Sequence, residues 1–153
     1  MKSIAYQPEI DGLRALAVLS VVFFHLKFSF FGGGFIGVDI FFVISGYLIS
    51  SILFTEIRKN NFDFKIYLKK RLKRLVPALA FTAFISLCFS YLILSPLDLV
   101  NFSKSVLSSI FFVSNIFFWN QSNYFDQVSD FKPFLHTWSL GIEMSFYLIW
   151  PIF

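Results

Sequence analysis

The chain has 153 residues and a formal charge of +4; 57% of its residues are hydrophobic and only 14% are charged. An ordinary soluble domain carries about 25% charged residues. Together with a mean hydropathy of +0.72, this composition excludes such a domain and indicates a membrane protein. The single cysteine, Cys88, cannot form an internal disulfide and is interpreted as a packing residue in an apolar run.

Apolar runs recur along the chain and predict an all-α, polytopic integral membrane bundle of about four or five helices. The first three are predicted at 13–31, 35–54 and 75–95, each close to the roughly 20 residues that a membrane span requires. A shorter segment is predicted at 106–119, and a last one runs from 138 to 153, where the chain stops inside it.

The connections between these segments predict the topology. Three glycines at 32–34 indicate a tight turn, which would make the first two helices an antiparallel hairpin. The next connection, 56–74, is predicted to be a loop and holds eight of the chain's 13 basic residues. Because cytoplasmic loops are enriched in lysine and arginine, we expect this loop and the N-terminus in the cytoplasm and the glycine turn outside.

Two polar residues interrupt the first segment. Arg14 and His25 are eleven residues apart, so on a helix they share a face to within roughly 20° and lie about 16 Å apart. The arginine requires a negative partner, either Asp11 or the phosphate of a ligand. Ionisable groups within membrane segments usually serve function. The alternatives are an arginine that marks the membrane boundary and a neutral histidine bonded to a neighbouring helix.

Asp39 is expected at the depth of His25 on the second helix, because a hairpin that turns near Gly33 places residue 25 opposite roughly residue 41. A carboxylate beside an imidazole fixes its tautomer and raises its basicity. Equally open is the interpretation that the sequence GVD caps the second helix, with Asp39 in its first turn.

Four motifs stand in order along the chain: EIDGLRALAVLSVVFFH, GGGFIGVDIFFVISGYLI, YLKKRLKRLVPAL and HTWSLGIEMSFYLIWP. Together, over about residues 10–151, they resemble the membrane acyltransferase family 3, a large bacterial family that O-acylates carbohydrates. The last motif departs from the family's usual HTWSLSVEEQFYLIWP. Glu143 keeps the first glutamate, whereas Met144 and Ser145 replace the second glutamate and the glutamine. Family members carry more helices than this chain supplies. The resemblance therefore implies the N-terminal part of such a domain, and no turnover by this part alone is expected.

The resemblance implies transfer of an acyl group, with acetyl favoured, from acyl-CoA to a hydroxyl of a cell-surface or lipid-linked carbohydrate. The family's arginine–histidine pattern falls on Arg14 and His25, with the histidine as general base. Its Arg-x-x-Arg pattern falls on Arg71 and Arg74, which would share a helix face and bind one donor phosphate group, with Arg14 helping at the membrane edge. The alternative is that the whole basic segment serves only to set the membrane topology and to bind anionic lipid.

Glu143 and His136 complete the candidate site. They are seven residues apart and would share a face if the last helix extends back to His136. Catalytic roles are predicted for His25, Asp39 and Glu143, and substrate binding for His136 with the three arginines. A structural role for Glu143 is the alternative, as is an interfacial anchor at HTWS through Trp138.

The predicted partners are acyl-CoA as donor substrate, a carbohydrate acceptor, the lipid bilayer, and the missing C-terminal helices or a complementary chain. No permanently bound cofactor, no metal and no nucleic acid are expected, and the predicted location is the bacterial inner membrane. Two rival classes are open: a transporter or ion-translocating fragment, whose polar stripe would be a proton pathway, and a non-catalytic remnant. Binding of acyl-CoA would separate the enzyme from the transporter.

Overall fold

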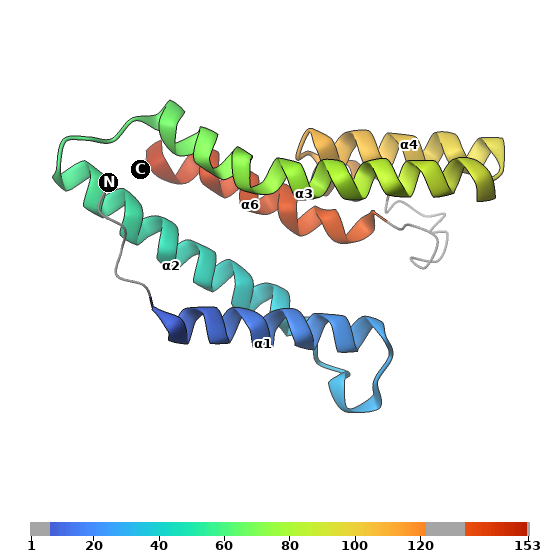
Figure 1. Ribbon diagram of the computed structural model, residues 1–153, viewed down its shortest axis with the longest axis horizontal. Coiled ribbons are helices and arrows are strands. Elements are labelled where there is room, and N and C mark those ends of the chain that lie inside the picture. Colours follow the sequence, from blue (N-terminus) through green and yellow to red (C-terminus); the bar gives the residue numbers. More distant parts are fainter. Residues whose placement is uncertain (1–6, 122–133, 153) are drawn as a thin grey trace. The chain divides into compact units, whose positions relative to one another are not determined.

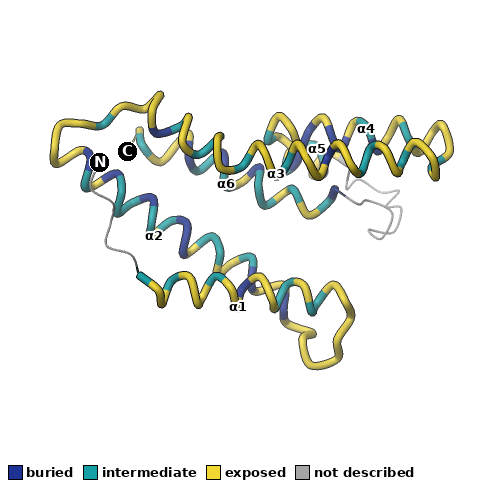
Figure 2. The backbone as a smooth tube through the Cα atoms, viewed as in Figure 1, coloured by how far each residue is buried: buried dark blue, intermediate teal, exposed yellow. Residues whose placement is uncertain are grey.

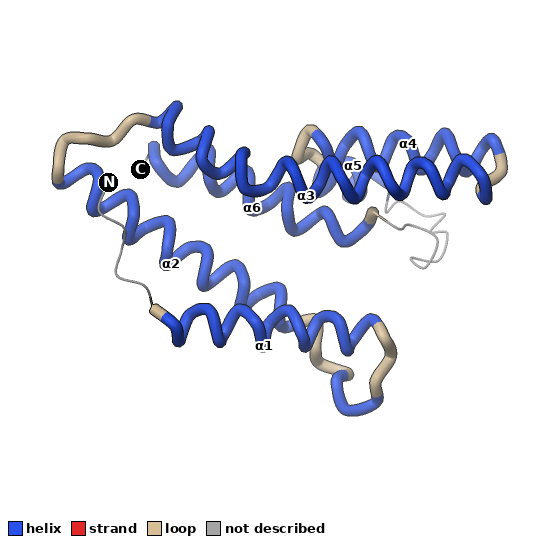
Figure 3. Tube along the Cα trace, viewed as in Figure 1, coloured by secondary structure: helices blue, strands red, loops and turns tan. Residues whose placement is uncertain are grey.

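The structure is a computed structural model that describes residues 7–121 and 134–152, and within these ranges every regular element is a helix (Figure 3). The chain divides into two compact units, Met1–Phe62 and Asp63–Phe153, which are taken in turn. Among the helices described, two, α2 and α3, are long and apolar enough to cross a membrane. The helical class is therefore confirmed, whereas only two of the four or five expected spans meet this test.

Helix α1 (Pro8–His25) begins and ends earlier than the predicted segment 13–31. Its start is explained by the first turn, because Pro8 is pre-organised for a helix and the carboxylates of Glu9 and Asp11 favour the helix N-terminus. The helix ends at His25, so this histidine lies at a helix end and not deep inside a longer one as expected.

The connection to helix α2 (Ile36–Arg58) covers residues 26–35 and includes a short 3₁₀ helix, η1 (Ser29–Phe31). It is longer than the three-glycine turn that the sequence suggests. Helix α2 in turn continues past the predicted end at residue 54. In Figure 1 the two helices lie closest near this connection and diverge toward their other ends.

Two glycines set the closest approach of α1 and α2. A Cβ at Gly34 would overlap the backbone oxygen of Ser20, and one at Gly37 would overlap the backbone oxygen of Ala17 and lie 2.8 Å from a methyl of Val21. Only residues without a Cβ allow the backbones to pack this closely, as small residues do between membrane helices. The contact fixes the register of the hairpin.

The second unit opens with helix α3 (Phe64–Ile93), whose start corrects the predicted loop 56–74. The Asp63 carboxylate accepts hydrogen bonds from the backbone N–H groups of Lys65 (2.7 Å) and Ile66 (3.1 Å), which caps the helix. The lysines, arginines and leucines that follow are good helix formers. Only residues 59–63 separate the two helices, and six of the eight basic residues lie in α3.

The predicted segment 106–119 is in fact two helices, α4 (Pro96–Ile110) and α5 (Ser114–Gln121). Helix α4 begins at a proline, after Ser95, whose hydroxyl accepts from the backbone N–H of Asp98 (3.3 Å) and donates to its carboxylate (2.6 Å). Phe112, with a φ of 57°, lies in the left-handed region and breaks the chain direction between the two helices.

The last predicted segment, 138–153, contains helix α6 (Trp138–Ile149), followed by a 3₁₀ helix, η4 (Trp150–Ile152); Phe153 lies outside the described residues. Another 3₁₀ helix, η3 (Leu135–Thr137), precedes α6. In Figure 1, α4 follows the C-terminal half of the long helix α3, and α6 follows its N-terminal half. The core of this unit consists of Ala83, Phe102, Val106, Phe118 and Phe134.

Most positions of α3 are exposed (Figure 2), and many of them carry apolar side chains. Phe81, Phe84 and Leu92 are each about two-thirds or more exposed, at 67%, 68% and 78%. Such a long apolar surface is unfavourable in water and suits contact with lipid or with further helices.

Candidate functional site

The guanidinium of Arg71 forms the centre of a cluster between α3 and α6. Its central carbon lies 5.6 Å from the ring centroid of Tyr67 and 5.6 Å from that of Tyr147. Both distances are within the range of cation–π attraction. Tyr67 is one helical turn before Arg71, and both tyrosines are buried. The arginine is thus held by rings from two helices.

Glu143 joins this cluster through Tyr147. The tyrosine hydroxyl donates a hydrogen bond to the Glu143 carboxylate, one turn earlier on α6. The positive charges of Arg71 and Arg74 both act on the same hydroxyl. Two cations, a carboxylate and two phenols therefore meet on one side of α3, which is a suitable arrangement for binding and orienting an anionic group.

The cluster unites two regions that sequence reasoning singled out separately. Arg71 and Arg74 come from the basic segment, and Glu143 comes from the last motif, about 70 residues later. The structure thus brings three of the predicted site residues together within the second unit. The replaced positions of the last motif lie beside them: Met144 is buried, and the hydroxyl of Ser145 donates to the backbone oxygen of Gly141 (3.0 Å).

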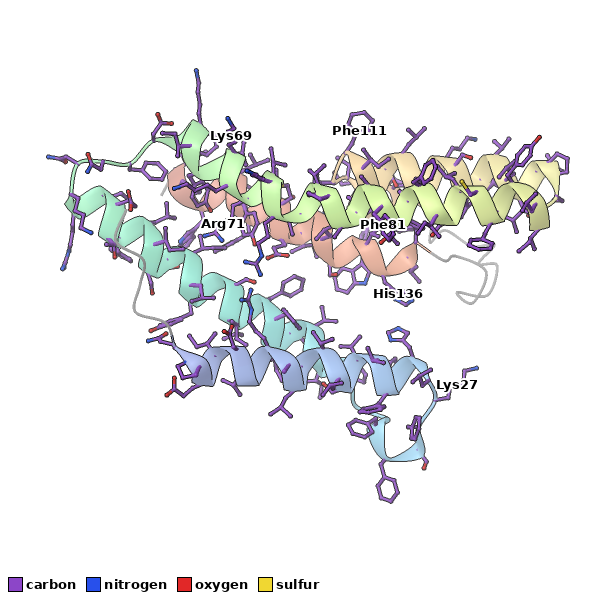
Figure 4. The ribbon with its side chains drawn as sticks, in the orientation of Figure 1. Lys27, Lys69, Arg71, Phe81, Phe111 and His136 are labelled. Atoms are coloured by element: carbon purple, nitrogen blue, oxygen red, sulfur yellow. The ribbon has the colours of Figure 1, made fainter. Side chains whose placement is uncertain are left out.

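His136 is exposed and precedes α6, so the condition under which it would share a helix face with Glu143 is not met (Figure 4). The helix starts only at Trp138, because residues 135–137 form η3. The next residue, Thr137, is anchored by a buried hydroxyl network. Its oxygen Oγ1 lies 2.6 Å from Oγ of Ser109, and its backbone oxygen accepts from the hydroxyl of Ser114 (2.7 Å). These hydroxyls fix the turn that carries His136.

The first unit holds the other candidates. A nitrogen of the Arg14 guanidinium lies 4.0 Å from a carboxylate oxygen of Asp11, so the arginine has the nearby negative partner that the sequence suggested. Asp11 is half exposed, and such surface pairs contribute little to stability. Because α1 is continuous from Pro8 to His25, the predicted common face of Arg14 and His25 is retained.

The tautomer of His25 follows from its hydrogen bond. Nδ1 lies 2.8 Å from the backbone oxygen of Val21. A carbonyl oxygen only accepts, so Nδ1 carries the proton, and in the neutral ring Nε2 then carries the lone pair. A neutral imidazole with this tautomer is the form in which histidine acts as a general base.

The hairpin register does not place Asp39 level with His25. Gly37 packs against Ala17, and Asp39 follows two residues later, so it is level with the turn of α1 around Ala17. That turn lies about 12 Å from His25 along the helix. Nor does Asp39 cap α2, which begins after Phe35 without a side-chain cap; its carboxylate lies in the first turn, where the helix dipole favours it.

Among the described residues, no group of three or more metal-binding side chains lies close enough to hold a metal ion. The charged groups of the Arg71 cluster instead suit an anionic substrate.

A comparison with known protein families identifies the chain. The family described as an acyltransferase domain, the acyltransferase family 3, matches residues 7–153. The chain belongs to this acyltransferase family.

Curated relatives of this acyltransferase segment come from several bacteria. The O-acetyltransferase OatA of Staphylococcus aureus (strain NCTC 8325 / PS 47) is 44% identical over 99% of this chain and 25% of its own length. The peptidoglycan O-acetyltransferase OatA of Listeria monocytogenes is 46% identical over 97% of this chain and 24% of its own. The putative peptidoglycan O-acetyltransferase YrhL of Bacillus subtilis is 44% identical over the same shares, 97% and 24%.

The acyltransferase segment therefore spans about a quarter of the length of the curated relatives it matches. No solved structure matches it significantly.

Sequence reasoning missed several residues of this acyltransferase segment that build the site. Tyr147 stands in the last motif, four residues after Glu143, and Tyr67 stands four residues before Arg71. This i,i+4 spacing on helices was an available signal for both tyrosines. The contact of Ser109 and Ser114 with the turn of His136 had no comparable signal, because it joins distant parts of the chain.

Proposed function

We propose that the chain is part of a membrane enzyme that transfers an acyl group, with acetyl as the favoured group, from acyl-CoA to a carbohydrate hydroxyl of peptidoglycan. The observation that carries this proposal is the Arg71 cluster, in which an arginine is held between Tyr67 and Tyr147 beside Glu143. Membership of the acyltransferase family supports the reaction type. The names of the relatives that act on peptidoglycan support the acceptor.

Arg71 and Arg74 are proposed to bind the phosphates of the donor. The aromatic rings contact the face of the guanidinium, so N–H groups in its plane stay available. These N–H groups can bind two phosphate oxygens at once. The two rings restrict the Arg71 side chain before the donor arrives, and a restricted side chain loses less conformational entropy on binding. Arg14 is proposed to assist donor binding, and His136 to bind the carbohydrate acceptor.

His25 is proposed as the general base. In the reaction, Nε2 takes the proton of the acceptor hydroxyl while its oxygen attacks the thioester carbonyl carbon. The carbon–oxygen bond of the new ester forms, the carbon–sulfur bond breaks, and the CoA thiolate leaves and receives the proton. Glu143 is proposed as a supporting carboxylate, oriented by the hydroxyl of Tyr147.

The membrane arrangement belongs to the same proposal. We assign the chain to the bacterial inner membrane as part of a polytopic bundle, with α2 and α3 as spans and the basic start of α3 in the cytoplasm. The donor would then reach the Arg71 cluster from the side on which acyl-CoA is made.

Equilibrium binding of acetyl-CoA to the protein, purified in detergent, tests this function. Replacing Arg71 and Arg74 by alanine removes two charge-assisted contacts of about 1.5–3 kcal/mol each, which should weaken binding at least about tenfold even if the effects add poorly. Replacement by lysine should restore the charge but not the planar fork, and therefore only part of the affinity. Unchanged affinity in a folded double alanine variant would reject the donor site.

A further inference from the structure

The basic start of α3 has two faces of different character. Lys65, Lys69 and Lys73 follow one another at intervals of four residues, so each is rotated by only roughly 40° from the last. The mean direction of Arg71 and Arg74 lies roughly 170° from the middle of that stripe. We call the three lysines the lysine face; it is opposite the side of α3 that carries the Arg71 cluster.

The lysine face takes no part in the cluster. All three lysines are exposed, and in Figure 4 Lys69 lies on the side of α3 away from α6, whereas Arg71 lies on the side where α6 runs. Among the described residues, none of the three lysines forms an ion pair. Three uncompensated cations in one stripe indicate a surface that binds anions.

The same helix indicates where this surface lies. No charged residue occurs between Leu75 and Ile93, a stretch about 28 Å long as a helix, which matches the roughly 30 Å hydrocarbon core of a bilayer. With that stretch in the membrane, Lys73 and Lys69 lie about 3 and 9 Å before its start along the axis. Lys65 lies about 15 Å before it. Lys73 falls at the depth of the lipid headgroups, and Lys69 lies just outside that layer, at the membrane surface.

We propose that the lysine face binds the headgroups of anionic phospholipids, and that the opposite, arginine-bearing face is thereby kept for the acyl donor. The proposal rests on the membrane location given above for the proposed function. Lipid is favoured over other anionic partners because α3 is continuous through its basic start into the apolar stretch, so the lysines cannot move away from the membrane surface. If the whole basic segment served donor binding alone, its lysines and arginines would not need to lie on opposite faces of α3.

The test is a titration of the purified chain in detergent with dioleoylphosphatidylglycerol, with dioleoylphosphatidylcholine as the neutral reference, read by native mass spectrometry. A lysine near an anionic membrane surface contributes roughly a fivefold factor in affinity. The triple variant Lys65→Gln, Lys69→Gln, Lys73→Gln should therefore lose at least about tenfold in affinity for the anionic lipid, with its affinity for acetyl-CoA unchanged. The matched triple lysine-to-arginine variant keeps the charge and should bind the lipid as the wild type does.

A double alanine variant on the opposite face of α3 supplies the reciprocal control. Alanine at Arg71 and Arg74 should leave binding of the anionic lipid intact, whatever it does to acetyl-CoA, so failure of the donor site is distinguished from failure of the lipid site. The proposal is overturned if the triple glutamine variant retains its affinity for phosphatidylglycerol. It is also overturned if alanine at Arg71 and Arg74 reduces lipid affinity as much as glutamine at the three lysines does. Circular dichroism of each variant confirms that helix content is unchanged.

Discussion

Tyr147 has two separable contacts, and two substitutions distinguish them. Tyr147→Phe removes the hydroxyl that donates to Glu143 but keeps the ring beside Arg71. Tyr147→Leu removes both. Because the tyrosine is only 3% exposed, each change acts in a well-packed environment and water cannot easily replace the lost group.

The magnitudes follow from these contacts. A hydrogen bond to a charged group contributes about 1.5–3 kcal/mol, and the partial exposure of Glu143 places the expected loss of stability for the phenylalanine variant at the lower end. The leucine variant also loses a cation–π contact of about 0.5–2 kcal/mol and leaves part of a ring-sized volume unfilled. We expect it to be less stable than the phenylalanine variant by at least about 1 kcal/mol.

Donor affinity provides the sharper readout. If the ring of Tyr147 restricts Arg71, the phenylalanine variant should bind acetyl-CoA within about twofold of the wild type, whereas the leucine variant should bind several-fold more weakly. Calorimetric titration with acetyl-CoA and thermal unfolding in detergent measure the two effects on the same samples. Equal donor affinity of the two variants would refute the reasoning that the ring positions the arginine.

Three further predictions concern the scaffold of the site. Gly37→Ala should destabilise the protein by about 1–3 kcal/mol because the new Cβ would meet the backbone of α1. Gly46→Ala, where no atom lies near the new Cβ, should be neutral or stabilising. Thermal unfolding compares the two variants, and equal effects would contradict the close approach of α1 and α2. Ser114→Ala should cost about 1–3 kcal/mol because the part-buried backbone oxygen of residue 137 loses the Ser114 hydroxyl as a donor. Ser139→Ala, which removes only an exposed local bond, should be nearly silent in the same assay. Asp11→Asn should change stability by no more than about 0.5 kcal/mol, since the two charged groups are 4.0 Å apart and Asp11 is half exposed. A loss above about 1 kcal/mol in low-salt unfolding would show that the pair is stronger than its geometry indicates.

The sequence predicts helices well where hydrophobic runs and capping residues indicate the same helix bounds, and less well where they indicate different bounds. The class and the approximate places of α1, α2, α3 and α6 follow from apolar runs. The predicted loop 56–74 failed because positive charge was interpreted as loop, although lysine and arginine are good helix formers and Asp63 supplies a cap. The break between α4 and α5 has no strong marker, since it depends on a phenylalanine with positive φ.

The candidate site shows a similar division. The pairing of Arg71 with Arg74 on one helix face follows from their spacing, and the face shared by Arg14 and His25 follows in the same way. The contact of Arg71 with Tyr147 depends on how α6 packs against α3, which no local pattern encodes. The level of Asp39 was misjudged because the length of a turn sets the register of a hairpin, and glycines do not reveal that length.

The most direct test of the account is acyl transfer by His25 variants in the protein as the cell makes it, inserted in membranes, with labelled acetyl-CoA and a peptidoglycan glycan as acceptor. Glutamine can hydrogen-bond but cannot act as a base near neutral pH, so His25→Gln should reduce transfer by about 10²–10⁴-fold while membrane insertion and acetyl-CoA affinity stay close to those of the wild type. His25→Ala should behave in the same way. Near-normal transfer by the glutamine variant would contradict the assignment of His25 as the general base and would leave it a structural histidine.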